Sequence, residues 1–101
     1  MKQIERITAM EDNLDRATEA VKRLTEALDQ YAEAQTALAE LSAYYGSEEW
    51  KQDFAADEQG KLPKDLKRGV LSEDGIWNLL ADNHDLNIRM LELVAQILKQ
   101  K

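Results

Sequence analysis

The sequence predicts an all-α fold in which a long N-terminal helix packs antiparallel on a C-terminal helix, as in a helical hairpin or coiled coil. A short helix and turns lie between them. No Gly or Pro occurs from residue 2 to about residue 43, and apolar residues repeat there at alternating spacings of three and four. A similar repeat returns after residue 75. Because 101 residues is a usual domain size, we expect one helical domain over 1–101, divided into a long helix (1–45), a short helix plus turns (46–75) and a C-terminal helix (76–101).

The long helix is predicted by composition and by periodicity. Its segment is rich in Ala, Glu, Leu, Gln and Arg, which favour helix formation. Its a and d positions are filled by Ile7, Met10, Leu14, Ala17, Val21, Leu24, Leu28 and Tyr31. Such a pattern is typical of a helix that packs along its length on a near-parallel helix.

The first third of this helix is too long for the C-terminal helix to cover. In an antiparallel pairing the last residue of the chain falls near Ala20, so Ile4, Ile7, Met10 and Leu14 extend beyond it. Because an exposed apolar stripe usually marks an interface, we predict that these four residues form the seam of a homodimer. The alternative is that the helix breaks near residues 10–13 and folds its first turns back.

The middle segment begins with a clear stop signal. Gly46 is suited to end the long helix. Ser47 is a good N-cap for a short helix, and Glu48 and Glu49 in its first turn favour the helix dipole. We expect this helix to end near Gly60 and to be followed by turns around the only proline of the chain.

Ser72 is the predicted N-cap of the last helix, with Glu73 and Asp74 in its first turn and Lys99 near its end. Its a and d positions include Ile76, Leu79, Leu86, Met90, Leu93 and Ile97. Further apolar residues widen this stripe, namely Leu80, Leu91, Val94 and Leu98. A stripe of that width indicates that the helix contacts more than one neighbour.

Composition excludes several classes of function. The formal net charge is -7, with acidic and basic residues interleaved, so the chain has no basic patch for nucleic acid. The absence of cysteine removes disulfides, thiolate zinc sites and cysteine nucleophiles. Neither a signal peptide nor an apolar run of membrane-spanning length is present in the sequence. We therefore expect a cytoplasmic protein with no nucleic-acid or membrane partner.

Aromatic residues gather in the middle of the chain. Five of the six lie between positions 44 and 77, namely Tyr44, Tyr45, Trp50, Phe54 and Trp77. The clustering indicates a small core that caps the end of the helix pair. The alternative is an aromatic groove that binds a peptide or another protein.

Acidic residues and the single histidine give weak signals for chemistry. Glu49, Asp53 and Asp57 can share one helix face, but no histidine or liganding loop is adjacent to complete a metal site. His84 has no nucleophile placed to use it. We predict a non-enzymatic protein with no cofactor. The alternative is a small-ligand or metal-binding protein or enzyme with a site at the 44–77 segment. Asp53, Asp57 and Glu58 of that segment and His84 would then surround a pocket at the end of the helix pair.

One stretch resembles a known family. The residues that carry the resemblance are Tyr44 to Trp50, Asp53-Phe54, Asp57-Glu58, Gly60 to Pro63 and Leu66 to Leu80. They are similar to the small bacterial proteins of domain-of-unknown-function family 4298. The resemblance implies a bacterial cytoplasmic protein that stands alone, and it implies no activity, cofactor or catalytic residue.

On these grounds we predict a protein–protein interaction or scaffold module. The candidate partner-binding residues are Tyr45, Trp50, Phe54, Asp57, Lys67, Arg68 and Trp77. They lie at the opposite end of the long helix from the predicted dimer seam.

Overall fold

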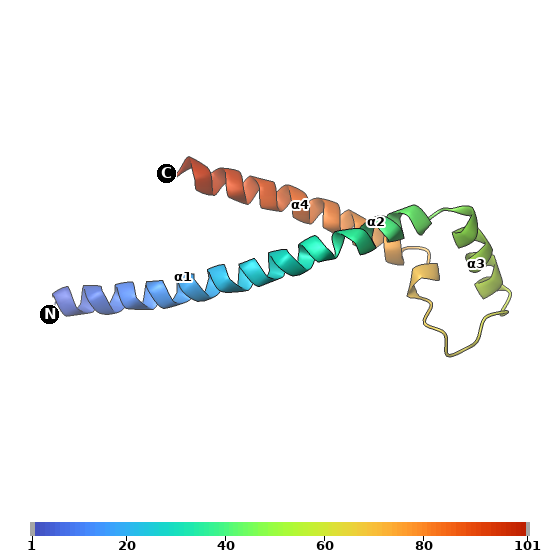
Figure 1. Ribbon diagram of the computed structural model, residues 1–101, viewed down its shortest axis with the longest axis horizontal. Helices are drawn as coiled ribbons and strands as arrows, with labels where there is room; N and C mark the ends of the chain where they lie inside the picture. Colours follow the sequence, from blue (N-terminus) through green and yellow to red (C-terminus); the bar gives the residue numbers. More distant parts are fainter. Residues whose placement is uncertain (1, 101) are drawn as a thin grey trace. The chain divides into compact units, whose positions relative to one another are not determined.

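The computed structural model describes residues 2–100 and is all-α (Figure 1). The elements in chain order are α1 (Lys2–Glu33), α2 (Gln35–Tyr44), α3 (Glu48–Glu58), the 3₁₀ helix η1 (Gly69–Leu71) and α4 (Gly75–Lys99). No strand occurs within residues 2–100. The expected class and the order of long helix, short helix with turns, and C-terminal helix are confirmed. The chain divides into two compact units between Thr36 and Ala37.

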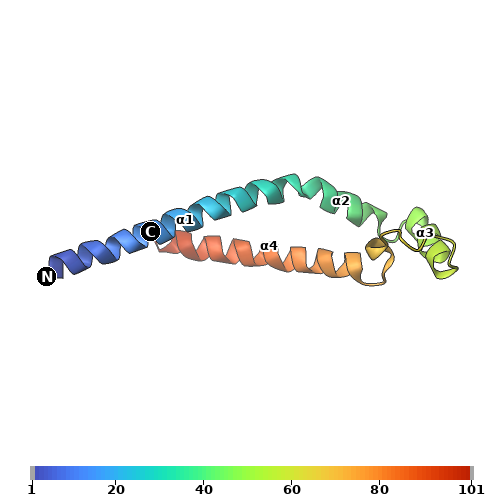
Figure 2. The same ribbon diagram turned by 90° about the horizontal axis from the view of Figure 1, so that it is seen from below.

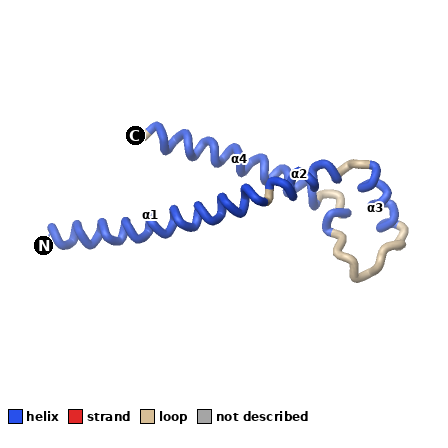
Figure 3. Tube along the Cα trace, in the orientation of Figure 1, coloured by secondary structure: helices blue, strands red, loops and turns tan. Residues whose placement is uncertain are grey.

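The helix α1 is continuous through residues 10–13, so the alternative of a break there is wrong (Figure 2). An interruption lies instead at Ala34, between α1 and α2 (Figure 3). The Ala34 amide still donates to the Gln30 carbonyl at 3.0 Å. The side-chain amide of Gln35 donates to the Tyr31 carbonyl at 2.9 Å. A side chain that enters the backbone ladder is a known cause of helix distortion.

The junction of α2 and α3 follows the expected capping chemistry. Gly46 has a φ of 80°, which favours glycine over other residues. The Ser47 hydroxyl oxygen accepts a hydrogen bond from the Trp50 amide at 3.1 Å, and Glu48 and Glu49 occupy the first turn of α3. The start of α3 was therefore predictable residue by residue.

The start of α4 differs from the prediction. Ser72 is not its N-cap, because α4 begins at Gly75 with Asp74 in the capping position. The Ser72 hydroxyl instead accepts from the Gly75 amide at 3.1 Å and donates to the Gly69 carbonyl at 2.8 Å. The 3₁₀ turn of η1 holds Ser72 in extended backbone, so the α-helix starts only after it.

Gly75 is required at this turn by close packing. A Cβ atom there would lie 2.5 Å from the Ser72 hydroxyl oxygen and 2.7 Å from the Gly69 carbonyl oxygen. Both separations are shorter than van der Waals contact permits. The turn between η1 and α4 therefore depends on a residue without a side chain.

The core is small. Among the described residues, the buried hydrophobic side chains are Leu71 and Ile76, which are 6% and 2% exposed. They lie where η1 contacts α4, close to the contact of η1 with α3. None of the helices within residues 2–100 combines the length and apolarity that crossing a membrane requires.

Candidate functional site

Three aromatic rings form a continuous stack at the start of α3. The rings of Tyr45 and Trp50 meet edge to face, with centroids 5.2 Å apart and an interplanar angle of 64°. Trp50 and Phe54, one helical turn apart, stack at 5.1 Å and 27°. Aromatic pairs at these separations add about 0.5–1.5 kcal/mol each beyond their buried area.

The polar ends of two of these rings bind the segment that precedes α4. The Trp50 indole N–H donates to the Val70 carbonyl at 2.9 Å. The Tyr45 hydroxyl donates to the Glu73 carbonyl at 3.2 Å. The stack therefore attaches α3 and the end of α2 to η1. This favours the interpretation that Tyr45, Trp50 and Phe54 form a small core over the interpretation that they line a binding groove. All three rings are nevertheless half-buried, so part of each remains accessible.

An ion pair closes the loop that follows α3. The Arg68 guanidinium donates to the Asp57 carboxylate at 2.8 Å, and their side chains are 37% and 26% exposed. Figure 3 shows the loop that runs from the end of α3 to η1. A charge-assisted bond in a partly buried place is stronger than a surface pair. Arg68 and Asp57, two of the predicted partner-binding residues, are thus placed together.

Tyr44 and Asp53 form a second pair that the sequence did not indicate. The Tyr44 hydroxyl donates to the Asp53 carboxylate at 2.5 Å. This bond, with smaller contributions from burial and from the negative charges of Asp53 and Glu49, raises the pKa of the Tyr44 hydroxyl from its ordinary 10.0 to about 12. The protonated phenol is therefore the form that the fold stabilises.

Replacing Tyr44 with Phe is expected to lower the free energy of unfolding by about 1 kcal/mol at neutral pH, because one hydrogen bond is lost. The pKa is raised on folding, so the contribution of Tyr44 is complete below pH 10.0 and is lost as the pH rises toward about 12. The difference between the two proteins should therefore disappear in that interval, measured by urea unfolding.

Ultraviolet titration of tyrosinate gives the control for this prediction. The chain has three tyrosines, and the step that titrates last should be missing from Tyr44→Phe. In Asp53→Asn that step should shift toward the ordinary value. An unchanged titration in both variants would contradict the assignment.

Two surface hollows flank the first turns of α4. One has a volume of about 410 Å³, and its walls are Leu41, Lys67, Gly69, Val70, Gly75, Ile76 and Leu79. The other has a volume of about 330 Å³, and its walls are Ser42, Tyr45, Trp77, Leu80, Ala81 and His84. Both are mainly apolar, and the first carries a single cation at its rim.

Lys67 and Trp77, two of the predicted partner-binding residues, thus lie in different hollows, and both are exposed. Leu41 and Leu79, which line the first hollow, were not among the predicted site residues. The spacing of apolar residues along a helix does not show whether a residue such as Leu41 or Leu79 lines a surface hollow or lies in the core.

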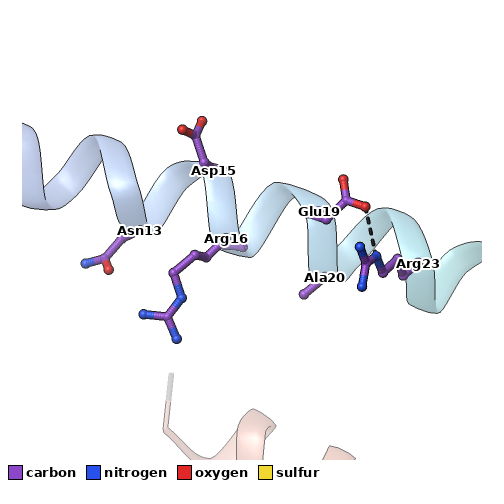
Figure 4. A pocket seen from close by; sticks show the side chains of 7 residues that line it. Asn13, Asp15, Arg16, Glu19, Ala20 and Arg23 are labelled. Atoms are coloured by element: carbon purple, nitrogen blue, oxygen red, sulfur yellow. Dashed lines mark hydrogen bonds and ion pairs between the residues drawn. The ribbon is translucent and has the colours of Figure 1, made fainter.

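A third hollow lies along α1. Its walls include Asn13, Arg16, Ala20 and Arg23, and Arg23 pairs with Glu19 at 2.8 Å (Figure 4). All of its walls belong to one helix. An open groove of this kind along a charged helix face has no features of a binding site.

The residues of the alternative enzyme or metal site do not form one constellation. Asp53 binds Tyr44, Asp57 binds Arg68, and His84 lines the hollow beside Trp77. Within residues 2–100, no group of three or more His, Cys, Asp or Glu side chains could hold a metal ion.

The predicted dimer seam lies on the exposed surface of α1. Ile4, Ile7, Met10 and Leu14 are 53–59% exposed, and Val21 farther along is 65% exposed. Because α1 with the first residues of α2 makes up its whole unit, no second helix of that unit packs on this stripe.

The sequence pattern of the family described as "Domain of unknown function (DUF4298)" matches residues 7–93. The match spans most of the chain and includes every candidate partner-binding residue. Among curated proteins and solved structures, none matches the chain.

Proposed function

We propose a function for this chain, which belongs to the DUF4298 family; the description of that family assigns no activity. The chain is a non-enzymatic protein–protein interaction module of the cytoplasm. It forms a homodimer through the α1 seam, defined as Ile4, Ile7, Met10 and Leu14. It binds another protein through the segment 44–77.

The observation that carries the proposal is the exposure of the α1 seam. Four large apolar side chains at helical spacing, each more than half exposed, make a continuous stripe on one face. Isolated helices are marginally stable in water, and most helical stability in proteins comes from packing an apolar face. A heptad stripe on a helix that fills its own unit therefore needs a further helix.

The segment 44–77 supports the second part of the proposal. The loop before η1 carries Lys64 and Lys67 as exposed cations, and Lys67 borders an apolar hollow of about 410 Å³. An apolar hollow with one charge at its rim fits an apolar side chain that has a carboxylate beside it. A protein partner with that chemistry is the occupant we propose.

The mass of the protein in solution tests the dimer. Light scattering of the wild-type protein at tens of micromolar is expected to give twice the chain mass of 11.5 kDa. A mass of one chain at that concentration would overturn the dimer.

Lys67→Glu tests the partner-binding segment. The substitution reverses the charge at the hollow and is expected to abolish capture of the partner from an extract of the native host by the tagged protein. The melting temperature should stay the same, because Lys67 is exposed. Lys64→Glu is the matched control, since it makes the same charge change outside the hollow. Equal capture by the two variants would contradict the proposal.

A further inference from the structure

The hollow beside Trp77 differs in chemistry from the hollow that Lys67 borders. This Trp77 hollow is formed on one side by Ser42 and Tyr45 and on the other side by Trp77, Leu80, Ala81 and His84 of α4. All six residues belong to the same compact unit. The volume of about 330 Å³ is at the lower end of the range for ligand pockets, which suits one side chain of a partner.

The walls of the Trp77 hollow suit a cation that has a hydrocarbon stem. Trp77 is 61% exposed, so much of its ring is open to a partner. Trp provides the strongest aromatic surface for a cation. The Ser42 hydroxyl and one ring nitrogen of neutral His84 can accept hydrogen bonds from N–H donors. Leu80 and Ala81 supply apolar surface for the stem.

The segments that form these walls carry acidic residues and no basic ones. The helix α2 contains Glu40, and residues 72–88 contain four acidic residues, namely Glu73, Asp74, Asp82 and Asp85. Neither segment contains a Lys or an Arg. Charge of one sign raises the local concentration of partner groups of the opposite sign. The Trp77 hollow therefore attracts a cation, whereas Lys67 at the other hollow attracts a carboxylate.

Glu73 is the acidic residue that the structure places at the edge of this hollow. The Tyr45 hydroxyl donates to the Glu73 carbonyl at 3.2 Å, and Tyr45 is one of the walls. The Glu73 side chain therefore starts beside the hollow. Asp85 directly follows His84 and is one helical turn from Ala81, so a second carboxylate lies near the opposite end.

We propose that the Trp77 hollow binds an arginine side chain of the protein partner, with the guanidinium stacked on the Trp77 ring. The inference rests on the proposed binding of another protein through the segment 44–77, and it names a second contact with that partner. Glu73 supplies the countercharge. The partner thus presents a carboxylate to the Lys67 hollow and a guanidinium to the Trp77 hollow.

Arginine fits these walls better than lysine does. Its guanidinium is planar, stacks on aromatic rings and is more weakly hydrated than an ammonium, so less hydration is lost when it enters an apolar hollow. Its five N–H donors can reach a hydroxyl, an imidazole nitrogen and a carboxylate at the same time. Its hydrocarbon stem packs on apolar surface.

Titration of the whole chain with blocked amino acids tests the occupant. The probe is N-acetyl-arginine methylamide, followed by two-dimensional NMR of the indole and backbone N–H groups. We expect saturable shifts at the Trp77 indole and at the amides of Ala81 and His84, with little change at the Trp50 indole. The citrulline analogue has nearly the same shape without the charge, and it should bind at least about fivefold more weakly.

Two substitutions and a matched control test the walls. Trp77→Ala should abolish the shifts at Ala81 and His84. Because Trp77 is exposed, the melting temperature should stay the same, as measured by circular dichroism. Glu73→Gln should weaken binding of the probe about two- to fivefold, because a countercharge is lost. Glu92→Gln makes the same charge change about two helical turns beyond His84 and should leave binding unchanged.

Equal binding of the arginine and citrulline analogues, or equal effects of Glu73→Gln and Glu92→Gln, would overturn the cation site. Tighter binding of the lysine analogue or of tetramethylammonium would overturn the assignment to arginine. If the arginine probe shifted none of these signals while Lys67→Glu lost capture and Lys64→Glu kept it, the second contact would be wrong and the proposed function would stand. Binding of the probe with equal capture by those two variants would contradict the proposed function, and with it the protein partner of this hollow.

Discussion

Replacement of Trp50 by Ala is expected to lower the free energy of unfolding of the unit that begins at Ala37 by about 3 kcal/mol. The Trp50 ring contacts both Tyr45 and Phe54, and its indole N–H donates to the Val70 carbonyl. Removal of a large aromatic side chain from a packed site costs about 3–5 kcal/mol, and the half-burial of Trp50 places it at the lower end. With so small a core, the loss is a large fraction of the total stability. Chemical denaturation followed by circular dichroism measures it.

Trp50→Phe distinguishes the contribution of ring stacking from that of the indole hydrogen bond. A phenyl ring can still stack on Phe54 but cannot donate to Val70, so this variant should lose about 1 kcal/mol. Gln52→Ala, at an exposed position of α3, is the control and should change little. If Trp50→Ala were as stable as Trp50→Phe, the ring would contribute nothing and the stack would be incidental.

Local signals in the sequence predicted the elements well. The chemistry of Gly46 and Ser47 located the junction of α2 and α3, because caps depend on residues adjacent in the chain. The interruption at Ala34 had no such signal, since Ala favours helix and no Gly or Pro is near. The prediction that Ser72 is the N-cap of the last helix is wrong by two residues, since Asp74 holds that position. The 3₁₀ turn that ends at Leu71 has no distinctive sequence pattern, so the sequence did not indicate it.

The contacts of the candidate site were less predictable, because they join residues distant in the sequence. The acceptor of the Trp50 indole is a backbone carbonyl 20 residues away, and a carbonyl carries no mark of its partner in the sequence. Clustering in sequence also grouped Trp77 with the other aromatics. Trp77 is 61% exposed, whereas Tyr45, Trp50 and Phe54 stack together. Whether these residues bind a partner stays a prediction.

The pairing of Asp57 with Arg68 shows what sequence reasoning can and cannot decide about charge. The sequence places acidic residues in α3 and basic residues in the loop that follows it, and one ion pair joins the two segments. The choice of Arg68 over the other cations of the loop depends on how the loop returns to α3. The path of a loop follows from tertiary contacts, here those of η1 with α3.

Introducing Glu at both Met10 and Leu14 is expected to convert the proposed homodimer to monomer. Each substitution removes an apolar side chain whose burial contributes about 1.5–3 kcal/mol, and it places a carboxylate where the second copy would desolvate it. Because the seam is shared, both copies lose these contributions. The dissociation constant should therefore rise at least about a thousandfold, as measured by sedimentation or by light scattering over a dilution series.

The matched control for this prediction is Thr8→Glu with Ala9→Glu. It adds the same two charges to α1 at adjacent positions that lie outside the heptad seam, and it should leave the mass of the assembly unchanged. At the same concentration, helical content should be lower in the seam variant than in the control, because an unpacked helix in water frays. If both double variants kept the dimer mass, the stripe of Ile4, Ile7, Met10 and Leu14 would not be the interface. The exposure of that stripe would then need a partner other than a second copy.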